Sequence, residues 1–547
     1  MTRDSGGKSS PRSAPPALGW VASAVAILLL ALVPLLPRAL ADGDPAALVG
    51  LPGESILVLA LLCLLPWRLA RGVLATGFAI VVVVAILLAG IDAGYRSALD
   101  IPFDPLEWPQ LGDAFGVLEG SVGAGAARGV IVLLALVAVG LVLVLSFAAL
   151  RVGTALRRRV RGQTMIAAFI AAWTVIALTG SQLAGQPAAP TASVQAIGES
   201  VDHAADGLAA AAELSRQIAT DPYRDAPRSD LLTALQGKDV VFAFVESYGR
   251  VAVEGDGFSD GVRQVLRDGE AQLRVDGYTS RTAFLTSPTF GGLSWLAHST
   301  FHTGLWVDRQ TLYSKVMRSG RLTLSAAFGE AGWRTVGVIP SNTEPWPLGA
   351  SFYRWDTMLD VNDLGYRGPR FGYARVPDQY TWTYVDDQVL ADDSRPIMAE
   401  VDLVSSHSPW TPLPELVPSS DVDDSSVYEA QFARGESATE LWQDPERVRR
   451  AYAASIEYSL GATFAFLHER DDPDLVLVVL GDHQPMAAVS GRDAGHDVPI
   501  SIIAKDPAVF ESIEGWQWPD GMLPDADAPV WPMSAFRDRF LDAFSAR

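Results

Sequence analysis

The sequence predicts a helical membrane region followed by an α/β domain with a largely parallel central sheet. Five long apolar segments, nearly free of charge, occupy most of the first 185 residues. From about residue 236, short apolar runs alternate with helical patterns, which is typical of an α/β domain. Charge divides in the same way. Of the 42 Lys and Arg residues 13 precede residue 190, and of the 63 Asp and Glu residues 10 do, which leaves a net charge of −24 after it.

This composition excludes some classes of function. A domain as acidic as the C-terminal part is not expected to bind nucleic acid. The single cysteine, Cys63, lies inside an apolar run. The chain therefore forms no internal disulfide and no cysteine-based zinc site.

The five apolar segments are each roughly 20 residues long, enough for a helix to cross ~30 Å of hydrocarbon. Buried core helices are the alternative, and the length and low charge of the runs disfavour it. A basic tail precedes them at residues 1–16. The predicted segments are 17–41, 53–70, 72–91, 128–150 and 164–185.

Loop charges predict the orientation of these segments. With the N-terminus in the cytoplasm, ten basic residues fall inside and three outside. Five crossings then place everything after Gly185 outside. Ala39-Leu40-Ala41 resembles a signal-peptidase site, but the first run is long for a signal peptide and we expect an uncleaved anchor. Cleavage would leave four crossings and the same external domain.

The sequence thus divides into four parts. A cytoplasmic tail (1–16) and a five-helix transmembrane region (17–185) are followed by a linker (186–235) and an extracellular catalytic domain (236–547). Within the linker, apolar residues between Ile197 and Leu214 recur at helical spacing. They predict either an amphipathic helix beside the membrane or an ordinary helix at the domain edge.

The external domain is expected to contain five strands and five helices. The strands are predicted at 240–245, 334–339, 397–404, 475–480 and 498–503. The helices are predicted at 258–268, 294–303, 320–331, 446–468 and 533–545. The acidic, serine-rich stretch 418–440 is interpreted as a surface insertion.

Metal-binding residues follow two of the predicted strands. The apolar run Val240–Val245 ends at Glu246, and the run Leu475–Leu480 leads through a glycine to Asp482 and His483. Ligands of open α/β sheets bind outside the carboxyl ends of the strands. Two buried strands that deliver Glu, Asp and His to one edge therefore predict a metal site.

A third segment adds a candidate nucleophile. Gly291 and Gly292 allow the backbone to turn tightly, and Ser294 follows where a helix would begin. A helix N-terminus favours anions, and a hydroxyl beside a cation can attack phosphorus. A simple N-cap role for Ser294 is the alternative.

Together, Glu246, Ser294, Asp482 and His483 resemble the site of the alkaline phosphatase and sulfatase superfamily. Two spacings carry the resemblance: Gly304 closes a Thr-Gly pair ten residues after Ser294, and a Gly-Asp-His sequence ends a strand. The layout is most similar to membrane phosphotransferases of the lipoteichoic acid synthase type. That resemblance implies five membrane helices, a linker helix and an alkaline-phosphatase-like extracellular domain. It also implies one metal ion held by these four residues.

The resemblance implies further roles. His407 would contact the substrate phosphate or a second metal, and Trp346 and Arg354 would hold the transferred head group. His496 resembles a second-metal histidine of phosphoethanolamine transferases, and a loop cap is its alternative. A satisfied loop histidine is the alternative for His407, and surface or core packing is the alternative for Trp346 and Arg354.

Two features depart from the family pattern. Many of its transferases use Thr as the nucleophile, and Thr289 is the fallback here, although it breaks the ten-residue spacing. The residues after Ser294 lack the signal for conversion to formylglycine, so sulfate ester hydrolysis is disfavoured. For His298 and His302, on the helix that Ser294 begins, we expect packing rather than a direct role.

The predicted activity is phosphoryl transfer through a covalent serine intermediate. The resemblance and the donor atoms imply a divalent cofactor, with Mn²⁺ expected and Mg²⁺ or Zn²⁺ as alternatives. The donor would be an outer-leaflet lipid carrying phosphoglycerol or phosphoethanolamine, and the acceptor a cell-envelope polymer or glycolipid. A phosphodiesterase or phosphatase that uses water, and a catalytically silent envelope sensor, remain alternatives. A transporter is disfavoured because the helices lack buried charge pairs.

Overall fold

The computed structural model describes residues 16–99, 101–110, 112, 124–158, 160–391, 394–422, 425–491 and 493–546. The predicted cytoplasmic tail lies outside these residues except for its last position. The chain divides into two compact units. One contains the chain up to Arg96 and Pro102–Gly207, and the other contains Ser97–Ile101 and Leu208–Arg547.

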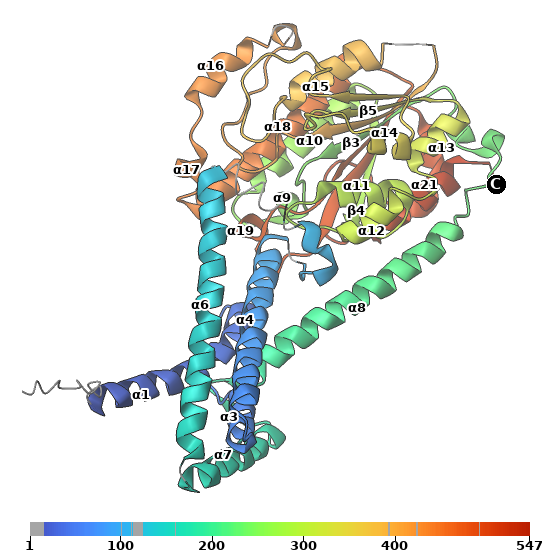
Figure 1. Cartoon of the computed structure of the whole chain (residues 1–547). Coiled ribbons are helices and arrows are strands. Elements are labelled where there is room, and N and C mark those ends of the chain that lie inside the picture. The colour runs from blue at the N-terminus through green and yellow to red at the C-terminus, as the bar shows by residue number, and fades with distance from the viewer. Residues whose placement is uncertain are drawn as a thin grey trace, which may run out of the picture. The chain divides into compact units, whose positions relative to one another are not determined.

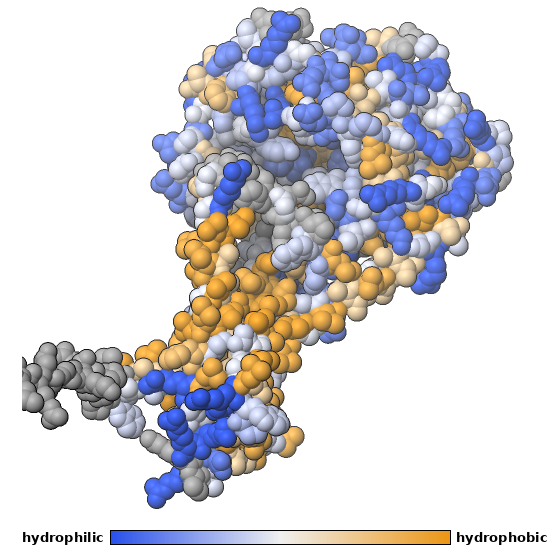
Figure 2. Space-filling model, viewed as in Figure 1, coloured by the Kyte–Doolittle hydropathy of each residue, from blue (hydrophilic) through white to orange (hydrophobic). Residues whose placement is uncertain are grey.

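The first unit confirms the five apolar helical spans, by length and composition. They run over Gly19–Asp42, Pro45–Leu64, Arg68–Ser97, Gly125–Arg157 and Arg161–Leu178. In the fourth span only 6% of the most apolar window is buried. Its outward side chains form part of the apolar surface in Figure 2. Exposure of so large an apolar surface to water is unfavourable, whereas its contact with lipid is not.

Two spans end earlier than predicted. Helix α3 (Gly53–Leu64) stops because Leu65 precedes Pro66, which disfavours helical backbone at the preceding residue. Helix α7 (Val160–Leu178) stops just before Gly180, whose φ of +62° is left-handed. These local stops, rather than apolar character, set the ends of the spans.

The predicted linker helix is present and begins earlier than expected. Helix α8 (Ala192–Ala219) follows a short hairpin of β1 (Gln182–Leu183) and β2 (Gln186–Pro187). At its start, Glu54 Oε1 accepts the backbone N–H groups of Ser193 at 2.8 Å and Val194 at 3.3 Å. A carboxylate at a helix N-terminus satisfies free N–H groups and complements the helix dipole.

The second unit is built around an eight-stranded sheet in the order β10-β4-β9-β8-β3-β7-β5-β6. Seven strands are mutually parallel, and β9 pairs antiparallel with both neighbours. This confirms the predicted α/β class. The strands are β3 (Asp239–Val245), β4 (Thr279–Thr286), β5 (Arg334–Ile339), β6 (Thr357–Asp360), β7 (Ile397–Leu403), β8 (Leu475–Gly481), β9 (Asp497–Ala504) and β10 (Val530–Pro532).

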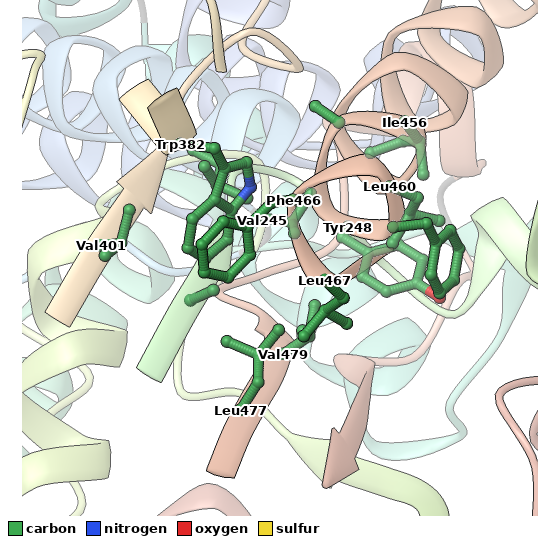
Figure 3. Close-up of a cluster of buried hydrophobic side chains, with 14 of the residues drawn as sticks. Val245, Tyr248, Trp382, Val401, Ile456, Leu460, Phe466, Leu467, Leu477 and Val479 are labelled. Atoms are coloured by element: carbon green, nitrogen blue, oxygen red, sulfur yellow. The ribbon is translucent and has the colours of Figure 1, made fainter. Parts of the chain in front are cut away.

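Helices cover both faces of the sheet (Figure 1). One core packs α10 (Asp260–Val275), α15 (Asp378–Tyr384) and α18 (Pro445–Arg470) against one face. Figure 3 shows part of it, with Trp382 and Phe466 beside the strand residue Val245. The other core packs α11 (Ser294–Thr303), α13 (Leu324–Ala331) and α21 (Phe536–Phe544) against the opposite face. The central strands are apolar because both faces are covered.

The stretch 418–440 is not wholly a surface insertion, as the sequence suggested. It forms α16 (Val427–Arg434) and α17 (Ala438–Leu441). Val422 and Tyr428 are fully buried and pack with Phe371 in a small separate core. Because the stretch as a whole is acidic, its few buried apolar residues were not predicted from the sequence.

Candidate active site

The site begins at the centre of the sheet. Strand β3 lies between β7 and β8 and is parallel to both. Their carboxyl ends therefore reach the same edge, where Glu246 follows β3 and Asp482 and His483 follow β8. One oxygen or nitrogen atom from each of these three side chains lies within 4.8 Å of the others. The structure thus brings together the ligands that the sequence placed after two separate strands.

Ser294 reaches this edge from a sharp turn. Gly291, Gly292 and Leu293 all have positive φ, at +68°, +157° and +63°. The turn makes Ser294 the first residue of α11, after Leu293 as N-cap. Leucine offers no capping side chain, so the helix N-terminus keeps the character of an anion site.

The Ser294 hydroxyl lies against two of the predicted metal ligands. Its Oγ donates to Glu246 Oε2 at 3.0 Å and lies 3.2 Å from His483 Nε2. That nitrogen is also 3.3 Å from Glu246 Oε1 and 3.5 Å from Asp482 Oδ2. Ser294 therefore uses its hydroxyl in the site rather than as an N-cap.

Backbone contacts orient the two ligands that follow β8. The amides of Ser247 and His483 each donate to Asp482 Oδ1 at 2.7 Å, which leaves Oδ2 facing the site. His483 Nδ1 lies 2.8 Å from the carbonyl oxygen of Gln484, so Nδ1 carries a proton and Nε2 is the nitrogen that faces the site. The two carboxylates beside Nε2 favour a positive charge there, which either a proton or a metal ion can supply.

The pKa values of these three side chains also indicate that the site attracts positive charge. Burial lowers the pKa of His483, but the charges of Asp482 and Glu246 outweigh burial and raise it to about 9. Burial and the charge of Glu246 raise the pKa of Asp482 to about 6. For Glu246, burial raises the pKa, but the hydrogen bond and charge of His483 and the charge of His407 outweigh it and lower the value.

This donor set fits a divalent ion. Two carboxylates, one imidazole with a fixed free nitrogen and a hydroxyl suit Mn²⁺, Mg²⁺ or Zn²⁺. All are buried or nearly so, with side chains of Asp482 and His483 each 1% exposed. Buried carboxylates need a counter-charge, which a metal ion would supply.

Glu246, Ser294 and Asp482 border an open cavity of about 660 Å³. Trp346 and His407, which the resemblance assigns to substrate binding, also line it. The His407 ring stacks on Tyr373 with ring centroids 3.7 Å apart, and its Nδ1 lies 2.6 Å from the carbonyl oxygen of Ser408. This leaves His407 Nε2 as the free ring nitrogen.

Two other predicted residues lie elsewhere. Arg354 is the left-handed C-cap of α14 (Pro347–Tyr353), and its side chain is 53% exposed and pairs with Glu330 at 2.6 Å. His496 precedes β9, where its ring packs near Phe290. Neither is among the described residues that line the cavity.

The fallback nucleophile is also outside the cavity lining. Thr289 is 2% exposed, and its backbone amide donates to Ser287 Oγ at 3.2 Å. Its hydroxyl lies 3.4 Å from the same Ser287 Oγ. The Ser247 hydroxyl also donates to Glu246, at 3.0 Å to Oε1, whereas the Ser294 hydroxyl contacts both Glu246 and His483 and borders the cavity.

Sequence reasoning missed Glu400 and Asp402 in the cavity wall and expected only packing for a third residue, His298. His298, Glu400 and Asp402 line it and form a second group whose donor atoms lie within 4.8 Å of one another. Glu400 and Asp402 alternate along β7, a central strand that should be apolar on both faces. That alternation was visible in the sequence, but the proximity of β7 to His298 on α11 was not.

Fold and site together define an α/β domain with a serine hydroxyl in a candidate metal centre at the carboxyl edge of its sheet. No protein-family model matches the sequence, and no curated protein matches it.

Solved structures do show a likeness. The lipoteichoic acid synthase LtaP from Listeria monocytogenes matches at 12% identity and a TM-score of 0.36, over 59% of this chain and 75% of that one. A protein of the alkaline phosphatase superfamily from Vibrio parahaemolyticus matches at 18% identity and a TM-score of 0.36, over 54% and 69%. The soluble domain of lipooligosaccharide phosphoethanolamine transferase A from Neisseria meningitidis matches at 14% identity and a TM-score of 0.38, over 58% and 93%.

The superfamily that the sequence motifs resemble is thus represented among these structures. At such identities and TM-scores, the likeness says nothing about the substrate or reaction of this chain.

Proposed function

We propose that this chain is a metal-dependent membrane phosphotransferase of the alkaline phosphatase and sulfatase superfamily. It would move a lipid head-group phosphoryl unit to a cell-envelope acceptor through a covalent intermediate on Ser294. The supporting observation is the position of Ser294 Oγ, 3.0 Å from Glu246 and 3.2 Å from His483, at a helix N-terminus that opens on a cavity.

Glu246, Asp482, His483 and Ser294 would hold the metal. Mn²⁺ is the expected ion, with Mg²⁺ or Zn²⁺ as alternatives. When bound, such an ion lowers the pKa of a coordinated hydroxyl and stabilises charge on phosphoryl oxygens.

The protein groups then have defined roles. Ser294 Oγ attacks phosphorus, so an O–P bond forms and the bond to the lipid alcohol breaks. Glu246 Oε2, at 3.0 Å, is the nearest acceptor for the hydroxyl proton, and the departing alkoxide takes a proton from solvent. The N-terminus of α11 stabilises the anionic phosphoryl group. The intermediate is a phosphodiester that joins Ser294 to the transferred head group. In the second half, an acceptor hydroxyl attacks its phosphorus, the bond to Ser294 Oγ breaks, and Ser294 recovers its proton.

The membrane unit supports the choice of a lipid donor. We place residues 236–547 outside the plasma membrane of a multi-pass protein whose N-terminus is cytoplasmic. Anchoring the domain at the outer leaflet would raise its effective concentration near lipid substrates. Phosphoglycerol and phosphoethanolamine are the proposed transferred groups.

The test uses the full chain in detergent, with a chromogenic phosphodiester and Mn²⁺ added after chelation. Ser294→Ala should abolish turnover and the covalent phosphodiester adduct on Ser294 detected by mass spectrometry, while metal-free protein should be inactive. Thr289→Ala, the matched control outside the cavity lining, should retain turnover. Full activity of Ser294→Ala would overturn the proposal. With a labelled lipid donor, label on a polymer or glycolipid would indicate transfer, and label released to water would indicate hydrolysis.

A further inference from the structure

The cavity contains a second group of polar side chains that the proposed reaction does not use. On β7, Glu400 and Asp402 point to the same face because side chains alternate along a strand. They face α11, where His298 lies one turn after Ser294. His298 Nδ1 lies 2.8 Å from Glu400 Oε1 and 3.7 Å from Asp402 Oδ1.

The carboxylates lie where the fold disfavours them. Glu400 is opposite Phe242 in β3, and Asp402 is opposite Phe244. Strands β3 and β8 show the usual apolar composition of a sheet covered on both faces. Burying a charge is costly unless it is paired or binds a metal, so two adjacent acids in this strand need an explanation.

Pairing within the protein leaves polar atoms unsatisfied. The Glu400 side chain is 2% exposed, yet its Oε2 has no hydrogen bond. His302 Nε2 lies 2.8 Å from that oxygen but is not oriented to donate to it. Asp402 Oδ1 is also buried without a hydrogen bond. Orphaned carboxylate oxygens beside a cavity are the atoms that a cation would use.

The charge of the cavity gives an independent reason. Among its described lining residues are five carboxylates and no Lys or Arg, the carboxylates being Glu246, Glu344, Glu400, Asp402 and Asp482. The proposed substrate is an anionic phosphodiester. One divalent ion offsets only Glu246 and Asp482, and the N-terminus of α11 adds about half a positive charge. A phosphate would still face Asp402 and the Glu400 carboxylate, near which His298 and His302 each have a ring nitrogen at 2.8 Å.

We infer that His298, Glu400 and Asp402 bind a second divalent cation in the same cavity. The inference rests on the proposed function for its charge argument and on the orphaned oxygens for its location. One imidazole nitrogen and two carboxylates match the donor types of the first site and suit Mn²⁺ or Zn²⁺. The second ion would offset Glu400 and Asp402 and so reduce the negative charge that an anionic substrate meets in the cavity.

The experiment counts metal ions on the full chain in detergent. Protein stripped with chelator is dialysed against buffered Mn²⁺, and bound manganese per chain is measured by mass spectrometry. Wild type should bind two ions. The isosteric double variant Glu400→Gln/Asp402→Asn should bind one, and Glu344→Gln, a cavity carboxylate outside both groups, should bind two. His298→Gln should also lose one ion, which covers the case in which the double variant fails to fold.

A second double variant, Glu246→Gln/Asp482→Asn, separates this inference from the proposed function. If wild type binds one ion that only this variant loses, the second site is overturned and the proposed function stands. If this variant keeps every ion while Glu400→Gln/Asp402→Asn loses one, the second site stands and the proposed function fails. Wild-type protein that binds no manganese overturns both. If His298 merely forms an internal ion pair with Glu400, no variant of these three residues will change the metal count.

Discussion

Gly481 lies between the buried strand β8 and the ligand Asp482. A Cβ at this position would lie 1.9 Å from the backbone oxygen of Tyr248. No real contact is that short, so any side chain must displace one of the two segments. The Gly-Asp-His sequence thus has a steric reason that does not depend on the metal.

We predict that Gly481→Ala lowers stability by about 1–3 kcal/mol, as overpacking of a buried site does. It should also weaken metal binding, because Asp482 shifts with the backbone. Thermal unfolding and manganese titration measure the two effects. Gly320→Ala is the matched control, since nothing lies within 4 Å of its Cβ and its φ is not left-handed. Equal unfolding midpoints for Gly481→Ala and this control would contradict the prediction.

Asp378 is a buried carboxyl group away from the cavity. Its oxygens accept the amide of Ser405 at 2.9 Å and the hydroxyl of Ser459 at 2.5 Å. Burial raises its pKa, the hydrogen bonds lower it, and the net value is about 6. Because the pKa of an unfolded Asp is about 4, the folded state binds this proton more tightly.

The stabilisation of the folded state that results from protonated Asp378 is fully present below about pH 4 and is lost as the pH rises through about 6. The change of two pKa units corresponds to about 3 kcal/mol at most. Asp378→Asn should remove this loss, since an amide can accept from Ser405 and donate to Ser459. Unfolding midpoints at pH 5 and pH 8 should therefore differ less in the variant than in wild type. Identical pH dependence in the two proteins would show that Asp378 does not titrate in this range.

Helix α11 is fixed at its C-terminal end by a buried ionic cluster. Arg537 of α21 lies 2.8 Å from Asp221, and both side chains are fully buried. Arg321 is 3.4 Å from the same carboxylate, and both arginines donate to the carbonyl oxygen of Thr303, the last residue of α11. The cluster therefore braces the helix whose first residue is Ser294.

We predict that Asp221→Asn destabilises the protein by about 3–5 kcal/mol, because it leaves two buried guanidinium groups without a full counter-charge. Thermal unfolding followed by tryptophan fluorescence measures the change. Glu415→Gln, which breaks an exposed pair with Arg434 whose side chains are 72% and 65% exposed, should cost less than about 1 kcal/mol. Similar losses in the two variants would mean that the buried cluster contributes no more than a surface pair.

At the scale of elements, apolar runs predicted the central strands well. The predictions at 334–339 and 294–303 match β5 and α11 at both ends. Strand β4 was missed because polar residues such as Arg281 and Thr282 interrupt its apolar pattern. Thr282 is satisfied by hydrogen bonds to Ser501 and to the backbone of Gly521, which come from distant parts of the chain. Strands β6 and β10 have four and three residues, too few for a periodicity.

The site shows the same contrast between residues that a local pattern predicts and residues that meet only through tertiary packing. Glu246, Asp482 and His483 could be predicted to meet because each follows a buried strand, and parallel strands end at one edge. His298, Glu400 and Asp402 meet because β7 and α11 pack together, which depends on the order of strands across the sheet. Arg354 was expected in the substrate site from the family resemblance, but the direction of its side chain depends on its left-handed backbone at the C-cap of α14. Sequence therefore predicts groups at strand ends better than contacts between a helix and a strand.

For the whole molecule, the separation of an apolar helical unit from an acidic α/β unit suggests separate tasks. Every described residue that lines the cavity belongs to the second unit. The chemistry should therefore not require the membrane helices, whereas access to a lipid donor should. This separation can be tested by removing the first unit.

We predict that residues 208–547 alone, with Mn²⁺, hydrolyse a soluble chromogenic phosphodiester with kcat/KM close to that of the full chain. Turnover of a lipid donor in vesicles should fall by about 10²–10⁴-fold, the usual range for loss of a tether. Restoring the tether through a histidine tag and nickel-chelating lipids should recover much of that activity. If the detached unit folds but fails on the soluble diester as well, the membrane unit contributes directly to the site. If it retains full activity on vesicles, the donor is not limited by membrane anchoring, and a soluble phosphodiester becomes the better substrate class.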